Sequence, residues 1–111
     1  MEVIPERGDI WWVAVDPTLG SEIRQTRPCV VVSVNVLNER RRTAIVVPLV
    51  SSPKTSPPIL IPISCDRHPA VAVSDQIRAV AKERLRSRLG VVTTEEMAAL
   101  EVGLKQIMQL G

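Results

Sequence analysis

The sequence predicts a mainly β protein with one C-terminal helix, and two observations support this prediction. Up to Val92, short runs of Val, Ile and Leu alternate with clusters of Pro, Gly and polar residues, a pattern typical of short strands joined by turns. After Thr93 the apolar residues recur at helical spacing instead. Five or six short strands followed by an amphipathic helix predict a small, strongly curved antiparallel sheet or barrel with the helix packed against it.

The predicted strands follow from these apolar runs and from the turn signals between them. Arg7-Gly8-Asp9 indicates a turn into the first strand, and Asp16-Pro17 indicates its end. The second strand is apolar on both faces and is therefore expected at the centre of the sheet. Pro62 places the fourth strand at an edge, because proline cannot donate a backbone hydrogen bond. The expected strands are residues 10–15, 28–34, 43–50, 59–63 and 89–92, with an extended stretch at 71–80 and a helical turn at 82–85.

Two connections and the final helix complete the prediction. Residues 35–42 are expected to form a polar connection, and residues 51–58, with three prolines and three serines, are expected to form a loop. Thr93 and Glu96 have the spacing of a capping box at the start of a helix. The face that this helix would bury is apolar and consists of Met97, Leu100, Leu104, Ile107 and Met108.

Length and composition predict one globular domain, residues 1–111. A chain of 111 residues buries roughly 65% of its unfolded surface, which is enough for one core. Hydrophobic residues make up 45% of the chain, which excludes a disordered composition. Aromatic residues make up only 2%, so the aliphatic residues Val, Ile and Leu must build the core.

The positive charge of the chain is concentrated in one segment. The formal net charge of the whole chain is +2, but the segment from Ile23 to Lys54 contains six cationic side chains against Glu39 alone, a local net charge of +5. A local basic field of this kind attracts a polyanion such as a nucleic acid. Composition alone leaves open the alternative of a solvated loop that uses arginine for solubility.

The sequence predicts a cytoplasmic protein without a metal or another cofactor. The N-terminus is acidic and broken by proline, and no apolar run approaches the length of a membrane span, so neither a signal peptide nor a membrane segment is expected. The two cysteines, Cys29 and Cys65, lack CxxC spacing, and Cys29 is expected to be buried within its apolar run. The single histidine, His68, is expected in an exposed loop, and one histidine is too few for a His/Cys metal cluster.

Arginine provides the main chemical signal, because the sequence has no Walker loop, no GxSxG elbow and no HExxH motif. A guanidinium is planar and always charged, so it binds phosphate through two hydrogen bonds and stabilises a developing pentacoordinate phosphorane. RNA has its own nucleophile in the 2′-OH group, and an enzyme that uses it needs charge stabilisation and proton transfer. Glu22, Arg24 and Arg27 have the residue types for such a site, although a solvated charged loop remains the alternative on residue type alone.

Base recognition would have to use amides and arginines. The chain has no Phe or Tyr, so stacking of bases on aromatic side chains is not expected. In the stretch SDQIRAV, the candidates are Asp75, Gln76 and Arg78, because a glutamine amide can form paired hydrogen bonds with a base edge. Gln76 could equally lie on a polar strand face.

Four segments together resemble one family of toxins. The stretches RGDIWWVAVDPTLGSEIRQTRPCVVVS, AIVVPLVSS, SDQIRAVAKERL and TTEEMAALEVGLKQIMQL are similar, in order and in spacing, to the MazF/PemK family of toxin endoribonucleases, also called mRNA interferases. The resemblance covers nearly the whole chain. It implies an SH3-type small β-barrel with a C-terminal helix, a homodimer, and the toxin half of a type II toxin–antitoxin pair.

The resemblance also implies an activity and its partners. Such enzymes cut single-stranded mRNA at short sequence motifs without a metal and leave a 2′,3′-cyclic phosphate and a 5′-OH. A MazE-like antitoxin with an acidic, disordered tail is the expected protein partner. The rival hypotheses are a weakened member that only binds RNA or antitoxin, and a CcdB-like gyrase poison of the same fold.

Residue by residue, the resemblance places the catalytic arginine of the family, the one before proline, on Arg27. The GSE loop of the family matches Gly20, Ser21 and Glu22, which would line the RNA cleft, and its RNA-reading glutamine matches Gln76. The predicted catalytic residues are Arg27, Glu22 and Ser52, and the predicted substrate-binding residues are Gly20, Ser21, Arg24, Ser51, Gln76 and Arg78.

The chain departs from the family at two positions. The catalytic threonine of the family falls on Val50, in the stretch PLVSS, and valine has no hydroxyl to bind a phosphate or to relay a proton. Ser52 is the expected substitute, because in a regular strand it lies on the same face as Val50, whereas Ser51 lies on the opposite face. The family has an acidic residue in the motif DK where this chain has Ala81, and nothing in the sequence explains that change.

Overall fold

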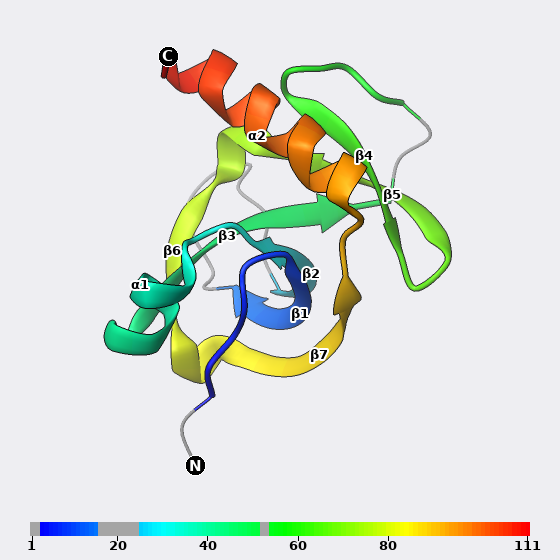
Figure 1. Cartoon of the computed structure of the whole chain (residues 1–111). Helices are drawn as coiled ribbons and strands as arrows, with labels where there is room; N and C mark the ends of the chain where they lie inside the picture. The colour runs from blue at the N-terminus through cyan, green and yellow to red at the C-terminus, as the bar shows by residue number, and fades with distance from the viewer. Residues whose placement is uncertain (1–2, 16–24, 52–53) are drawn as a thin grey trace.

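The structure, a computed structural model, describes residues 3–15, 25–51 and 54–111 and is mainly β, with a helix at the C-terminus (Figure 1). The elements are β1 (Asp9–Val15), β2 (Gln25–Val31), α1 (Asn35–Arg40), β3 (Thr43–Val50), β4 (Leu60–Cys65), β5 (His68–Val73), the 3₁₀ turn η1 (Ser74–Gln76), β6 (Arg78–Ala81), the 3₁₀ turn η2 (Lys82–Arg84), β7 (Leu85–Val91) and α2 (Thr94–Met108). The first and third predicted strands, the helical turn and the final helix are confirmed.

The strands pair antiparallel in one sheet. Along the sheet the order is β4-β5-β3-β2-β1-β7, and β6 pairs with β3 beside this path. β2 lies between β1 and β3, which confirms the central strand, and β4 lies at one end of the order, which confirms the edge position predicted from Pro62. The pairs among the described residues do not join β4 to β7, so the order is that of an open sheet.

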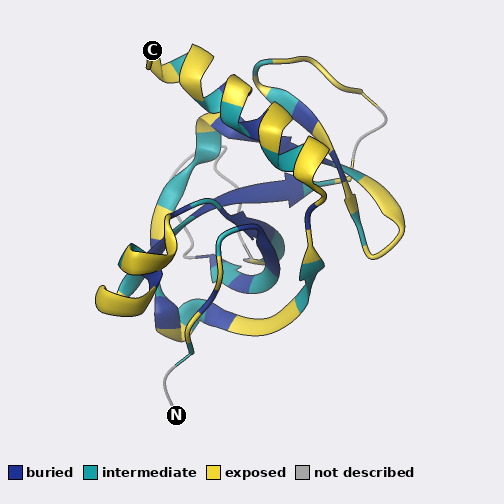
Figure 2. Ribbon diagram, in the orientation of Figure 1, coloured by how far each residue is buried: buried dark blue, intermediate teal, exposed yellow. Residues whose placement is uncertain are grey.

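The two faces of the sheet bury two separate clusters of apolar side chains. Figure 2 shows that buried residues recur along the strands. Val30 and Val47 belong to the first cluster, which also contains Leu100 of α2. Cys29 and Val46, each one residue earlier in its strand, belong to the second cluster. This division follows from strand geometry, because neighbouring side chains of a strand point to opposite faces of the sheet.

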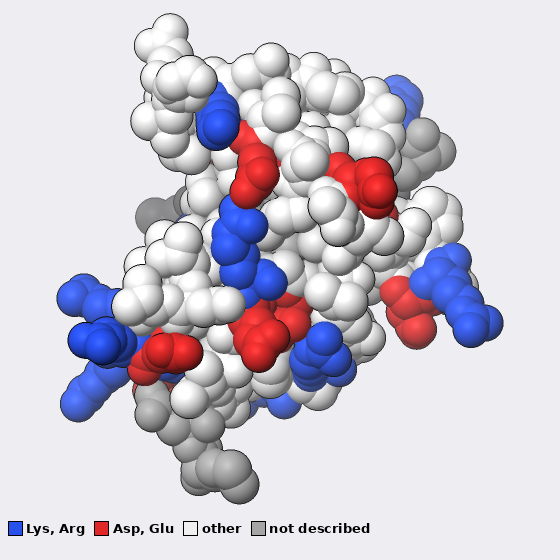
Figure 3. Space-filling view, in the orientation of Figure 1, with Lys and Arg blue, Asp and Glu red and all other residues white. Residues whose placement is uncertain are grey.

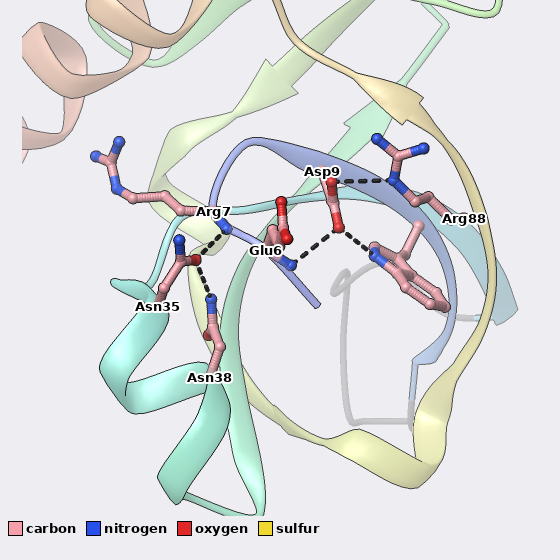
Figure 4. A network of polar contacts seen from close by, with 7 residues as sticks. Glu6, Arg7, Asp9, Asn35, Asn38 and Arg88 are labelled. Carbon is pink, nitrogen blue, oxygen red and sulfur yellow. Dashed lines mark hydrogen bonds and ion pairs between the residues drawn. The ribbon is translucent and has the colours of Figure 1, made fainter. Parts of the chain in front are cut away.

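A short helix replaces the predicted polar connection at residues 35–42. α1 has no side-chain cap, and its polar sequence gives little helical signal. Tertiary hydrogen bonds stabilise it instead, as Figure 4 shows in part. Asn38 is completely buried and donates from Nδ2 to the carbonyl of Ser33 at 3.0 Å, and the Asn35 side chain accepts a bond from the backbone N–H of Arg7 at 2.7 Å.

The predicted extended stretch at residues 71–80 is wrong as one element, because two different partners divide it. β5 pairs with the end of β3, for example Ala72 with Leu49, whereas β6 pairs with its beginning, where Arg78 faces Val46. One straight strand cannot make both sets of pairs, so η1 turns the chain between them. β7 is longer than the predicted strand at 89–92 because β1 offers it a partner along most of its length.

The second and fourth strands also differ from their predicted limits. β2 begins three residues earlier than expected, because residues 25–27 pair with β1, and it ends at Val31. β4 runs from Leu60 to Cys65, because the pairing with β5 continues to the turn. In both strands a tertiary partner sets the limits, and the local pattern alone does not.

α2 packs across the sheet as predicted, and its N-terminus forms the predicted capping box. The Thr93 hydroxyl accepts a bond from the Glu96 N–H, and the Glu96 carboxylate accepts from the Thr93 N–H at 2.9 Å and from the Ser64 N–H of β4 at 2.6 Å. A Cβ at Gly103 would lie 2.8 Å from the carbonyl oxygen of Pro58, so only glycine permits this close approach. Met108 is 44% exposed, so the prediction that it belongs to the buried face is wrong.

A buried aspartate fixes the beginning of the sheet (Figure 4). Asp9 is 4% exposed, and its Oδ2 accepts bonds from the Glu6 N–H at 2.9 Å and from Trp11 Nε1 at 3.1 Å. Its Oδ1 accepts from Arg88 Nε of β7 at 3.1 Å. Gly8 makes the turn that precedes Asp9 and has a φ of 93°. Glycine suits this position, because such a φ disfavours residues with a side chain. The carboxylate thus joins the N-terminal turn, β1 and β7.

Candidate functional site

A cavity of about 440 Å³ opens where β3 changes its partner strand. β3 pairs with β2 as far as Cys29 and Pro48, and from Leu49 it pairs with β5. β2 and β3 therefore separate between Arg27 and Val50, and the described residues leave a space between them. This space, here called the Arg27 cavity, is lined by Trp12, Thr26, Arg27, Pro28, Leu49, Val50, Ser51, Cys65, Asp66, His68, Pro69, Ala70 and Leu89.

Arg27 has a buried donor that nothing in the described part of the chain satisfies. Its backbone is fixed in β2, where it faces Val13 of β1, and the residue as a whole is half-buried. The Nε atom is buried and has no hydrogen-bond partner. Buried polar groups in folded proteins are nearly always paired, so this donor requires an explanation, and a catalytic role or a bound ion is one. The ligand that suits a guanidinium is an anion, above all a carboxylate or a phosphate.

A second cavity, of about 400 Å³, lies beside the first and contains the predicted base-reading residues. Here called the Gln76 cavity, it is lined by Val15, Cys29, Val46, Pro48, Asp75, Gln76, Ile77, Arg78 and Ala79. Arg78 and Val46 are paired residues, so their side chains lie on the same face of the sheet. Arg27 is on this face as well, because it precedes Cys29 by two residues.

The positive charges of Arg27 and Arg78 both act on the Cys29 thiol. Burial raises the pKa of Cys29 to about 12, and the positive charges of Arg78 and Arg27 oppose this rise without overcoming it. The opposing effect requires both guanidinium groups to lie near the thiol. The structure thus brings Arg27, Gln76 and Arg78 to one region, although 51 positions separate Arg27 from Arg78 along the chain.

Of the other predicted site residues, one lies within the described part of the chain and five lie outside it. Ser51 is exposed and lines the Arg27 cavity, next to Val50. Ala81 pairs with Thr43 of β3 and lines neither cavity. Val15 and Gln25 pair with each other, so the described strands on either side of residues 16–24 end beside the Gln76 cavity. The predicted residues Gly20, Ser21, Glu22, Arg24 and Ser52 lie outside the described residues.

Sequence reasoning missed one side of the Arg27 cavity. Cys65, Asp66 and His68 come from the turn between β4 and β5, and all three line the cavity. His68 is exposed, as predicted, but it begins β5 and is not in a long loop. No local pattern indicates these residues, because only the pairing of β5 with the end of β3 places the hairpin beside Val50.

In residues 3–15, 25–51 and 54–111 there is no group of three or more His, Cys, Asp or Glu side chains that could hold a metal ion. The helices in the same residues are too short or too polar to cross a membrane.

The fold and the two cavities define a small β-sheet protein with guanidinium groups and an amide gathered at its cavities. The description "PemK-like, MazF-like toxin of type II toxin-antitoxin system" fits residues 6–108, and the chain belongs to this family. It is 35% identical over 113 residues to "Endoribonuclease MazF9" of Mycobacterium tuberculosis, with 94% of this chain and 96% of that protein covered. It is 30% identical over 106 residues to "Endoribonuclease toxin MazF" of Escherichia coli, with 95% of each covered.

A solved structure supports the same assignment. The "Endoribonuclease in complex with its cognate antitoxin from Mycobacterial species" matches with a TM-score of 0.78 and 25% identity, over 96% of this chain and 97% of that one. The resemblance to the MazF/PemK family is therefore confirmed. The relatives that match almost end to end are named endoribonucleases, which confirms the expectation of an endoribonuclease for this chain.

Proposed function

We propose that this toxin cleaves single-stranded mRNA at short sequence motifs and uses the 2′-OH of the RNA as nucleophile, without a metal. The observation that supports this mechanism is the buried Nε of Arg27, which has no hydrogen-bond partner among the described residues and lies on the sheet face that carries Arg78 and the Gln76 cavity. A phosphate at Arg27 would receive the unused hydrogen bond. The neighbouring base would then lie toward the amide and guanidinium of the Gln76 cavity, where base edges can be read.

In the proposed reaction the 2′ oxygen attacks the adjacent phosphorus, and the bond from phosphorus to the 5′ oxygen breaks. Glu22 accepts the proton of the 2′-OH, and Arg27 stabilises the added negative charge on the phosphorane. Ser52, which follows the separation of β3 from β2, binds a phosphate oxygen in place of the missing threonine hydroxyl. The departing 5′ oxygen takes up a proton from water, and the products are a 2′,3′-cyclic phosphate and a 5′-OH end. Gly20, Ser21, Arg24 and Ser51 contact the RNA along the way to this centre.

We also propose the finer features of the fold and its partners. The chain is a single domain whose open sheet curls into an SH3-type small barrel, and it acts in the cytoplasm as a homodimer. A MazE-like antitoxin binds across the RNA site with an acidic tail, and a matched relative was solved with its cognate antitoxin. Figure 3 shows Lys and Arg side chains gathered beside α1, where Arg40, Arg41 and Arg42 are exposed. This patch would attract either polyanion.

A second candidate function is a weakened toxin that binds RNA or antitoxin and cuts slowly. The observation in its favour is Val50, which lines the Arg27 cavity without a hydroxyl. Binding would then depend on the same arginines, and affinity would fall as salt rises.

End mapping after incubation with RNA separates the two candidates. The purified protein is mixed with a long single-stranded RNA of mixed sequence, with and without EDTA, and primer extension locates the new 5′ ends. We expect cleavage at one short motif, unchanged by EDTA, with 5′-OH and cyclic phosphate termini. A requirement for Mg²⁺ would contradict the mechanism, and tight binding without new ends would support the weakened toxin.

A further inference from the structure

Three consecutive arginines form a basic patch where α1 ends (Figure 3). Arg40, Arg41 and Arg42, here called the α1 arginine patch, are all exposed. In the described part of the chain, their side chains form no hydrogen bond and no ion pair, and Glu39 of α1 does not pair with them. A guanidinium without a partner inside the protein is available to an anion from outside.

Buried hydrogen bonds fix the position of this patch. Asn38 of α1 is completely buried, and its Nδ2 donates to the carbonyl of Ser33 at 3.0 Å. The Ser33 hydroxyl accepts a bond from the backbone N–H of Ile45 at 3.0 Å, so α1 is attached to β3. A surface held in this way loses little conformational entropy when a ligand binds to it.

Strand register relates the patch to the Gln76 cavity. The Lys82 N–H donates to the Arg42 carbonyl at 2.9 Å, which continues the β3–β6 ladder by one pair. Arg42 is four residues from Val46, roughly 13 Å along the strand, and residues at this spacing lie on one face of a sheet. Val46 and its partner Arg78 both line the cavity. The patch and the cavity therefore lie along one side of the sheet.

A further contact connects the two places at the surface. Arg84, which is half-buried, donates from Nη1 to the carbonyl of Ala14 at 3.3 Å. Ala14 precedes Val15, which lines the Gln76 cavity, and Arg84 follows Lys82 by two residues in η2. Glu83, between these two cations, is exposed. An RNA strand that leaves the cavity in this direction would pass Arg84 and then reach α1.

We propose that the α1 arginine patch binds RNA outside the cleaved motif. The inference rests on the proposed cleavage of single-stranded RNA and adds a second contact for the same strand. Its guanidinium groups contact phosphates and read no base, so the patch raises the affinity for long RNA and leaves the motif unchanged. RNA is favoured over an acidic peptide, because the patch lies a few nucleotides away from the predicted base-reading cavity.

Removing two of the arginines tests this role. Arg41→Gln combined with Arg42→Gln leaves Arg40, whose charge stabilises the C-terminal end of α1. Fluorescence anisotropy measures binding over a range of salt concentrations to two RNAs with the motif found by end mapping. One RNA contains little more than the motif, the other has long flanks, and a 2′-deoxyribose at the cleaved position prevents reaction in both.

We expect the loss of affinity only for the long RNA. At about 0.1 M salt its affinity should fall about 10- to 30-fold, and log K should depend on log salt less steeply, by about 1.4 in slope, as expected for two lost phosphate contacts on a single strand. The short RNA should bind with the parent affinity. An unchanged affinity for the long RNA, or an equal loss on the short RNA, would overturn the proposal.

Arg67→Gln combined with Lys105→Gln is the matched control. It also removes two exposed cations, one from the β4–β5 turn and one from α2, which packs on the other face of the sheet. This variant should bind both RNAs as the parent does. Equal losses in the two double variants would mean that only the total charge matters, and the proposal would fail.

A polyglutamate peptide shows whether the patch serves an acidic protein instead. Loss of peptide binding in the Arg41→Gln, Arg42→Gln variant, with binding of the long RNA unchanged, would assign the patch to such a partner and overturn the proposal. A parent protein that leaves every RNA intact would refute the proposed cleavage. Binding of the long RNA by the two double variants would still decide the role of the patch.

Discussion

Two regions of the molecule differ in whether the polar atoms of a buried charged group have hydrogen-bond partners. At the beginning of the sheet, each carboxylate oxygen of Asp9 has a hydrogen-bond partner, and the partners come from three segments of the chain. At the separation of β2 from β3, the buried Nε of Arg27 has no partner within the described residues. Both side chains are held by the same sheet, on strands that pair with each other.

The difference teaches how to separate structural from functional polar groups. A satisfied buried group contributes to stability, because removing it leaves its partners unpaired at a cost of about 1–3 kcal/mol each. An unsatisfied buried group has already incurred that cost in the folded state, so removing it should not destabilise the fold. The Asp9 network is therefore expected to affect folding, and Arg27 is expected to affect activity.

The largest expected effect is the loss of cleavage in Arg27→Met. Methionine keeps much of the buried volume but removes the charge that stabilises the phosphorane, so the rate should fall by about 10²- to 10³-fold. The free energy of unfolding should stay equal to that of the parent or rise. Single-turnover cleavage of one RNA and urea denaturation measure the two quantities. A variant that is both active and unstable would reverse the assigned roles.

The next effect is on stability. Asp9→Ala leaves the Glu6 N–H and the Trp11 indole N–H without acceptors, so the free energy of unfolding should fall by about 2–4 kcal/mol. Glu101→Gln is the control, because its ion pair with Arg7 is partly exposed and should contribute less than about 1 kcal/mol.

The cleavage rate of folded Asp9→Ala, measured well below its melting temperature, should equal that of the parent. If this variant keeps full stability but loses activity, the network belongs to the functional region and the comparison fails.

A smaller effect is expected at the hydroxyls that follow β3. Ser52→Ala should slow cleavage by about tenfold, the value of one hydrogen bond, and Ser51→Ala should slow it less. Val50→Thr should raise the rate of the parent or restore that of Ser52→Ala, because threonine has nearly the shape of valine and adds the family hydroxyl. Single-turnover rates of the three variants decide between these positions. Equal rates in all of them would exclude a hydroxyl of this segment from the reaction.

The smallest effect is on thiol reactivity. Burial raises the pKa of Cys29 to about 12 despite the two arginines, so its thiolate fraction at pH 8 is very low. Burial also raises the pKa of Cys65, but this residue is partly exposed. Native protein should therefore be labelled by a disulfide reagent at Cys65 first, and at Cys29 only after unfolding. Labelling of Cys29 first would mean that the guanidinium charges outweigh burial.

The sequence by itself determined the class of the fold, and its local motifs indicated residues that line the two cavities. Val, Ile and Leu runs with alternating or continuous apolar faces specified the central strands, and Thr93 with Glu96 specified the start of α2. Arg27, Gln76 and Arg78 were identified from motifs, and they lie at adjoining cavities. These features depend on neighbours along the chain, which a sequence displays.

Only the tertiary structure decided which distant residues share a cavity. α1 forms because buried Asn38 bonds to Ser33, and residues 71–80 divide because β3 pairs with β5 at one end and with β6 at the other. The same exchange of partners opens the space between Arg27 and Val50 and places His68 beside it. Local propensity cannot encode this arrangement, because it depends on where one strand stops pairing with its neighbour, and that is settled by the packing of the whole sheet.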